Sequence, residues 1–189
     1  MRARDNPFRS ERVERLVYRA ERFDWKLLEA RLTEAGGRGA IVGPQGHGKT
    51  TLLLEWMARF GKQGSTWIRL SEGQRSLHRP QKSALSGAQR IFLDGAEQLG
   101  WWGWRDFLRR SRKAKTLIIT SHRPGLLPTL FSCQTSPQLL AELVTELQGE
   151  SLPVEALWQR HEGNIRLALA ELYDRWAKRP APGVPGHDG

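Results

Sequence analysis

The sequence predicts an α/β fold: a three-layer core built on a parallel sheet, followed by a small all-helical unit. Between residues 36 and 135, short apolar segments typical of buried strands alternate with segments whose apolar residues recur at helical spacing. Between residues 136 and 178 only the helical spacing occurs. We therefore expect an N-terminal arm and helix (1–35), a core (36–135), a helical lid (136–178) and a disordered Pro- and Gly-rich tail (179–189).

The strands of the predicted sheet are short apolar runs bounded by glycine, proline or polar residues. They are expected at residues 39–42, 65–70, 90–94 and 115–120, with a weaker fifth strand at 127–132. Because helices alternate with these strands, the strands should run parallel.

The expected helices combine apolar spacing with residues that favour helix ends. Before and within the core they span residues 11–35, 50–60 and 96–112, the last of them interrupted near Gly100 and Gly103. In the lid, Ser136 as N-cap and Pro137 at the first helical position begin one helix. Residues 153–159 and 164–176 form two more.

The composition indicates a globular chain with a basic middle. The 189 residues carry a net charge of +10, and no apolar run reaches the ~20 residues that a membrane helix needs. The N-terminus lacks the apolar segment of a secretory signal, and the single cysteine, Cys133, fits a reducing cytoplasm. Residues 69–123 hold 12 Lys and Arg against 4 Asp and Glu, a net of +8. This excess favours a polyanionic partner such as DNA, and solvated arginines are the equal alternative.

Residues 43–50 read Gly-Pro-Gln-Gly-His-Gly-Lys-Thr and fit G-x-x-x-x-G-K-[ST] at every fixed position. Glycines let such a loop turn its backbone N–H groups toward phosphate oxygens, and the following helix directs its positive end at the same anion. Lys49 is placed to reach the β- and γ-phosphates, and the Thr50 hydroxyl to ligate Mg²⁺. The predicted nucleotide-binding residues are Gly43, Pro44, Gln45, Gly46, His47, Gly48, Lys49, Thr50 and Thr51.

An acid at the end of a neighbouring strand is the second requirement of such a site. Asp94 ends the apolar run Arg-Ile-Phe-Leu-Asp and is expected to hold the Mg²⁺ shell together with Thr50. Many P-loop ATPases place a glutamate directly after this acid, but here that position is Gly95 and the next acid is Glu97. Glu97 either reaches back to the γ-phosphate to activate water or favours the N-terminus of the following helix. The difference separates an ATPase from a protein that only binds ATP.

The end of the fourth strand offers further polar groups, since ligands gather at the carboxyl ends of parallel strands. Thr120 or Ser121 would hydrogen-bond the attacking water or the γ-phosphate, or would cap the strand. Arg123 is either a charge-stabilising arginine or a surface residue before Pro124.

Three tryptophans lie close together after the strand acid, at residues 101, 102 and 104. We expect at least two of them to pack in the core. Any that remain exposed would suit an interface, or would stack on bases because arginines lie nearby in the sequence.

With these motifs the chain resembles the AAA+ superfamily of P-loop ATPases over roughly residues 5–178. It looks most like the compact bacterial ATPases of the secretion-pathway-A and transposition-helper type. The carriers of the resemblance are the Walker A motif GPQGHGKT, the Walker B strand IFLDGAE, the strand end IITSHRP and the helical lid. The Asp-Gly-x-Glu pattern is also similar to the signalling (STAND) branch of P-loop ATPases.

The resemblance implies roles for residues outside these motifs. Asn6-Pro7-Phe8 would lie against the nucleotide base, with residues 8–18 lining the adenine pocket. Arg166 would reach the γ-phosphate from the lid, and a solvated arginine is the equal alternative. A neighbouring subunit would insert an arginine finger, for which the candidates are Arg109, Arg110, Arg112 and Lys113.

The favoured interpretation is an ATP-binding, AAA+-like ATPase of the cytoplasm that uses Mg²⁺. It would couple ATP binding and hydrolysis to self-assembly and to a partner, for which DNA bound through residues 69–123 is the candidate. Its catalytic set would be Lys49, Asp94, Glu97, Thr120, Ser121 and Arg166. The alternatives are a non-hydrolysing switch that pairs with a protein and, less favoured, a small-molecule kinase that uses the basic segment 71–88.

Overall fold

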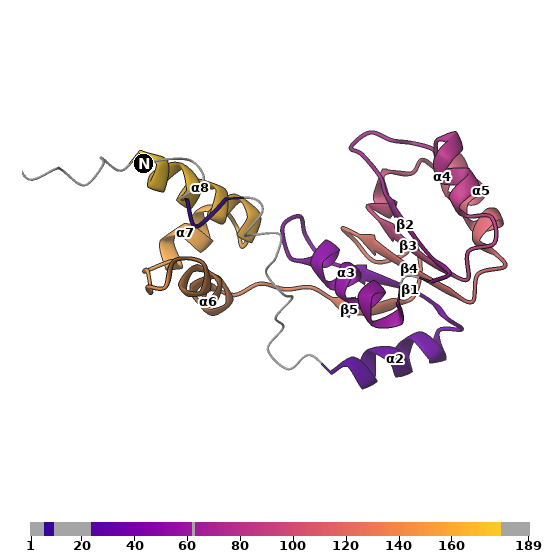
Figure 1. Cartoon of the computed structure of the whole chain (residues 1–189), viewed down its shortest axis with the longest axis horizontal. Coiled ribbons are helices and arrows are strands. Elements are labelled where there is room, and N and C mark those ends of the chain that lie inside the picture. Colours follow the sequence, from indigo (N-terminus) through magenta and orange to yellow (C-terminus); the bar gives the residue numbers. More distant parts are fainter. Residues whose placement is uncertain (1–5, 10–23, 62, 179–189) are drawn as a thin grey trace, which may run out of the picture. The chain divides into compact units, whose positions relative to one another are not determined.

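A computed structural model describes residues 6–9, 24–61 and 63–178 (Figure 1). The described residues fall into two compact units. Residues between 24 and 134 form an α/β unit, and residues 135–178 together with 6–9 form a helical unit. None of the described helices is long and apolar enough to cross a membrane.

The α/β unit is built on a five-stranded sheet in the order β2-β3-β4-β1-β5, in which every pair of neighbours is parallel. The strands in chain order are β1 (Arg38–Val42), β2 (Ser65–Arg69), β3 (Arg90–Asp94), β4 (Thr116–Ser121) and β5 (Thr129–Ser132). The predicted parallel α/β sheet is confirmed. Because β4 lies between β1 and β3 and the three strands are parallel, their carboxyl ends lie side by side at the same edge of the sheet.

Helices α2 (Trp25–Glu34) and α3 (Lys49–Phe60) cover one face of the sheet (Figure 1). The strand residues that point to this face share its core with leucines of both helices and with Trp56. Asp24 begins α2 by accepting hydrogen bonds from the backbone N–H groups of Lys26 and Leu27. The sequence predicted an earlier start for this helix, but residues 10–23 lie outside the described residues.

The opposite face carries α4 (Arg79–Ala84), the 3₁₀ turn η2 (Ala96–Gln98) and α5 (Trp101–Ser111) (Figure 1). Phe107 of α5 packs there against strand residues that include Ile91 and Ile119. The basic segment 71–88 contains the short helix α4. Its N-cap, His78, uses a capping box in which the Gln81 side chain accepts from the His78 backbone N–H.

The predicted helix at 96–112 is two elements that separate at Gly100, as expected, but α5 runs on through Gly103. The reason is a close approach of the loop before α4. A Cβ added to Gly103 would lie 2.2 Å from the backbone carbonyl oxygen of Arg75. Glycine is therefore present in the helix to admit this loop and not to end the helix.

The expectation that at least two of the clustered tryptophans pack in the core is wrong. Trp101 is 59% exposed and Trp102 is 77% exposed, whereas Trp104 is partly buried against the core. At the start of α5 the buried positions are instead Gly103 and Phe107, so the first two indoles project from the other side of the helix.

The helical unit contains α6 (Pro137–Gln148), α7 (Glu155–Arg160) and α8 (Ile165–Ala177). Ser136 caps α6 as predicted, since its side chain accepts from the Leu139 backbone N–H at 3.1 Å. Asn6 and Phe8 belong to this unit: the Asn6 side chain donates to the Tyr173 carbonyl oxygen at 2.9 Å, and Phe8 is 4% exposed.

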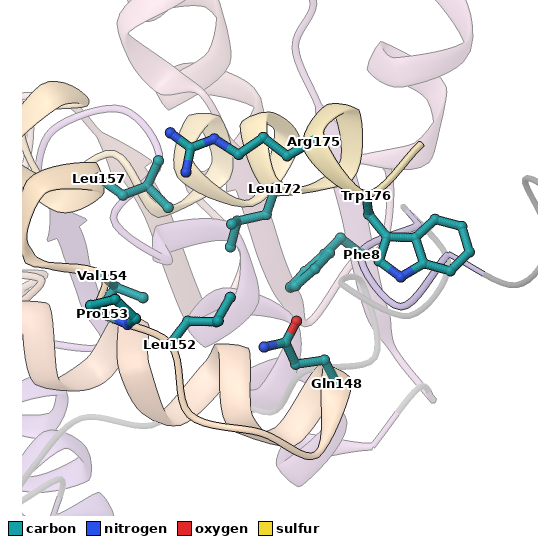
Figure 2. Close-up of a pocket in the computed structure, with 9 residues that line it drawn as sticks. All are labelled: Phe8, Gln148, Leu152, Pro153, Val154, Leu157, Leu172, Arg175 and Trp176. Carbon is teal, nitrogen blue, oxygen red and sulfur yellow. The ribbon is translucent and has the colours of Figure 1, made fainter. Parts of the chain in front are cut away.

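Phe8 also lines a pocket of about 180 Å³ in the helical unit (Figure 2). Leu152, Leu157, Leu172 and Trp176 form much of the remaining wall. The Arg175 side chain at its edge is held by Glu171, whose pKa is lowered by a hydrogen bond with His161 and by the neighbouring arginines. Most residues that line the pocket are apolar, and all of them belong to the helical unit.

Candidate nucleotide-binding site

The glycine-rich loop connects the end of β1 at Val42 to the start of α3 at Lys49. All three of its glycines, at 43, 46 and 48, have positive φ angles, as the motif requires. The N-cap of α3 is Gly48, which offers no side-chain cap, so the first-turn N–H groups of the helix face the loop. Strand, loop and helix thus have the arrangement that binds phosphate through backbone N–H groups.

Lys49 is folded back onto this loop. Its side-chain Nζ donates to the carbonyl oxygens of Gly43 and Pro44, each at 2.7 Å, and the residue is 8% exposed. A cation held within the loop adds to the positive potential of the helix N-terminus. His47, in contrast, contacts the Gln45 carbonyl oxygen through Nδ1 at 3.1 Å, so its ring serves the loop conformation.

Asp94, at the end of β3, contacts polar side chains from the start of α3 and from the end of β4. The Thr50 hydroxyl lies 3.0 and 3.1 Å from its two carboxylate oxygens. The Thr120 hydroxyl donates to Oδ1 at 2.8 Å and accepts from the Gly95 backbone N–H at 2.8 Å. Asp94 is 7% exposed and Thr120 is 1% exposed. Thr120 therefore orients the carboxylate and the turn that follows it.

The Thr50 hydroxyl and the Asp94 carboxylate fit a Mg²⁺ site chemically. Both are hard oxygen donors, and they converge to within hydrogen-bond distance beside the glycine-rich loop. The described residues contain no cluster of three or more His, Cys, Asp or Glu side chains that would hold a metal alone. Mg²⁺ usually takes one or two protein ligands and fills its remaining positions with water and phosphate oxygens.

Arg69 is a residue of this site that sequence reasoning missed. It is the last residue of β2 and pairs in register with Asp94. Its Nε donates to the second carboxylate oxygen of Asp94 at 2.9 Å, and its side chain is 57% exposed. The signal was available in principle, because parallel neighbours of similar length bring their last residues side by side.

Glu97 lies in η2, one turn beyond Asp94, and its side chain is 22% exposed. Its Oε1 is 3.1 Å from Nε2 of His122, which follows β4. Its Oε2 is buried and has no hydrogen-bond partner among the described residues. His122 is thus a second residue that the sequence did not single out.

Gly95 explains why the acid stands at position 97. Its φ angle is +85°, a left-handed conformation that a residue with a side chain rarely adopts. The turn made there hydrogen-bonds to Thr120 and places η2 against the end of β4. A glutamate directly after Asp94 would be strained in this backbone.

The remaining predicted residues lie in three different elements. The Ser121 hydroxyl donates to the Arg123 carbonyl oxygen at 2.9 Å and caps the strand end. Arg166 is exposed in the first turn of α8, in the helical unit, and pairs with no acid among the described residues. Thr51 lies in the first turn of α3.

The parallel sheet and the loop at its carboxyl edge define the class of fold: the α/β unit has the fold of a P-loop NTPase core. Among solved structures, the chain is similar to a STAND protein with a tetratricopeptide repeat sensor from Pyrococcus horikoshii, with 18% identity and a TM-score of 0.43. It is also similar to NtrX from Brucella abortus, with 14% identity and a TM-score of 0.46. The matches cover 89% and 87% of this chain but only 32% and 52% of those proteins. Comparison with protein-family models and with curated proteins gives no match.

Proposed function

We propose that the chain is an AAA+-like ATPase that binds ATP with Mg²⁺ at residues 43–51. The observation that carries the proposal is the convergence of Thr50, Asp94 and Thr120 beside the lysine-bearing loop. The loop N–H groups and Lys49 bind the phosphates, and Thr50 and Asp94 hold the metal. Bound Mg²⁺ would neutralise charge on the phosphate oxygens.

Within this proposal, Glu97 is the base for hydrolysis and Thr120 is a positioning residue. The Oε2 oxygen of Glu97 is buried and has no hydrogen-bond partner among the described residues, so it is the oxygen that accepts a proton from water. His122 fixes the other oxygen, Oε1. The Thr120 hydroxyl is hydrogen-bonded to Asp94 and to the Gly95 N–H, so Thr120 acts through the Asp94 carboxylate. Ser121 serves the strand end in the same indirect way.

We further propose that the protein assembles with neighbouring subunits, in line with the resemblance to AAA+ proteins. Arg166 of the helical unit would sense the γ-phosphate, and a basic residue at the end of α5 would reach a neighbouring subunit. Arg109 and Arg110 are both bound to Asp106. Arg112 and Lys113 are exposed and have no acidic partner in the described part of the chain, so neither is held by an ion pair there. We place the protein in the cytoplasm, with DNA as a partner of the basic region 69–123.

A non-hydrolysing nucleotide switch is the second candidate. It is favoured by Gly95 at the usual glutamate position and by the His122 contact, which would keep Glu97 away from water. The two functions differ in one measurable quantity, the rate of phosphate release at saturating ATP.

The test is phosphate release by the whole chain, with and without DNA, for the wild type and Glu97→Gln. A hydrolase with Glu97 as base loses about 10²-fold or more in rate and keeps its ATP affinity. A wild type that binds ATP but releases no phosphate under either condition identifies the switch. Equal rates in the two proteins would remove Glu97 from the catalytic set.

A further inference from the structure

The first turn of α5 presents two neighbouring indole rings to solvent. The rings of Trp101 and Trp102 are 4.3 Å apart between centroids and meet at 78°, in an edge-to-face contact. Trp102 is 77% exposed, more than any other large apolar residue of the described chain. Tryptophan side chains are normally at least partly buried, so two neighbouring exposed indole rings indicate a binding surface.

Arginines accompany the two rings along the same side of the helix. Trp102, Arg105, Arg109 and Arg112 follow one another at spacings of three, four and three residues, which places them in one stripe about 15 Å long. The Arg105 guanidinium lies 4.8 Å from the Trp101 ring centroid and has no acidic partner among the described residues. We call Trp101, Trp102, Arg105, Arg109 and Arg112 the α5 stripe.

The charge around the α5 stripe is strongly one-sided. Residues 101–115 contain six Lys and Arg and a single acid, Asp106. That acid is bound by Arg109 at 3.0 Å, by Arg110 at 2.8 Å and by Lys82 of α4 at 3.6 Å. The surface therefore keeps a positive excess after its internal ion pairs are counted, which complements a polyanion.

The α5 helix is anchored to the rest of the α/β unit on the side that does not carry the α5 stripe. The Gly100 N–H donates to the Arg75 carbonyl oxygen at 3.0 Å, and the same oxygen lies against Gly103. Phe107 is fully buried in the core below. The rings therefore stand on a fixed helix end, which reduces the ordering cost of binding to them.

We propose that the α5 stripe binds single-stranded nucleic acid, with an unpaired base stacked on the Trp102 indole and the arginines set along the phosphates. The inference rests on the nucleic-acid partner of the proposed function and specifies its form. Bases inside a duplex are already stacked on one another. An exposed indole can therefore stack on an unpaired base of a single strand but not on a base inside a duplex. Arg105 and Arg112, which have no acidic partner among the described residues, make this partner fit better than a protein surface, which would need matching acids.

The test is fluorescence anisotropy with a labelled oligo-dT strand and with a duplex of equal length, using the full chain. We expect Trp102→Ala to weaken single-strand binding about tenfold, Trp102→Phe to keep most of it, and duplex binding to change less than twofold in both. Arg105→Gln should weaken binding to both probes and lower the salt slope by about one. The controls on α2, exposed Leu27→Ala and Lys26→Gln, should bind as the wild type does.

The outcomes separate this inference from the function on which it rests. Equal single-strand affinity of the wild type and Trp102→Ala, with duplex binding intact, overturns the stacking site and leaves DNA as a partner. Absence of binding to either probe overturns both, and the stripe would then be assigned to a protein partner. ATP binding is unaffected by the stripe variants in every case.

Discussion

Nε2 of His122 lies 3.1 Å from Oε1 of Glu97, so a residue after β4 holds the acid that the turn after β3 provides beyond Asp94. The pair forms because Gly95 turns the chain and lays η2 beside the end of β4. The arrangement fixes one oxygen of the carboxylate and leaves the other, Oε2, without a hydrogen-bond partner among the described residues.

His122→Ala should therefore lower the rate of ATP hydrolysis about tenfold while the dissociation constant for ATP stays the same. His122→Gln, which keeps a donor on a side chain of similar reach, should recover part of the rate. Steady-state phosphate release and an ATP titration of both variants give the answer. A loss of ATP affinity, or no change in rate, would show that the pair does not position Glu97.

If Asp94 holds Mg²⁺ as proposed, Arg69 would compete with the metal ion for its carboxylate. The guanidinium Nε is 2.9 Å from Oδ2, and the arginine is more than half exposed, so the contact is worth at most about 1 kcal/mol. Arg69→Gln should lower the Mg²⁺ concentration needed for half-maximal ATP binding by up to about fivefold. A rise in that concentration would instead assign Arg69 to the nucleotide phosphates.

Gly103→Ala should destabilise the fold although alanine is the better helix former. The added Cβ would stand 2.2 Å from the Arg75 carbonyl oxygen, and the loop must move away. We expect a loss of about 2 kcal/mol in the free energy of unfolding, measured with urea. Gly100→Ala is the matched control, because its Cβ would meet the same oxygen at 3.6 Å, and it should lose less than about 1 kcal/mol. Equal losses would contradict the role of the close approach.

Asp106 contributes a stability that depends on pH. Hydrogen bonds from Arg110 and Arg109 lower its pKa from 3.8 to about 2. Because the folded-state pKa is the lower one, this stabilisation is fully present above the unfolded-state value and disappears as the pH falls through about 2. Asp106→Asn should therefore be less stable than the wild type at pH 7, and the difference should shrink toward pH 2. Urea titrations at several pH values check this, with exposed Asp174→Asn as control. A gap independent of pH would refute it.

Much of the core was predictable because its signals are local. Apolar runs gave strands that lie within two residues of their expected ends, and the loop at 43–50 placed Lys49, Thr50 and the start of α3. The Asp94 site followed from the rule that parallel strands end together.

The features that were missed depend on contacts between distant segments. Arg69 reaches the site through strand register, which can be used only once the neighbouring strands are known, and His122 reaches it through the turn at Gly95. Gly103 looked like a helix breaker because its partner, the Arg75 carbonyl oxygen, is remote in sequence. The exposed rings of Trp101 and Trp102 were assigned to the core because apolar size alone favours burial.

The central claim, that residues 43–51 bind Mg-ATP, is tested most directly by calorimetric titration of ATP into the wild type and Lys49→Ala. We predict saturable one-site binding by the wild type and at least a tenfold loss in Lys49→Ala, because the variant loses a charged donor to the phosphates. Lys26→Ala, on the exposed side of α2, should bind ATP as the wild type does. Binding of equal strength by the wild type and Lys49→Ala would contradict the assignment of this loop as the nucleotide site.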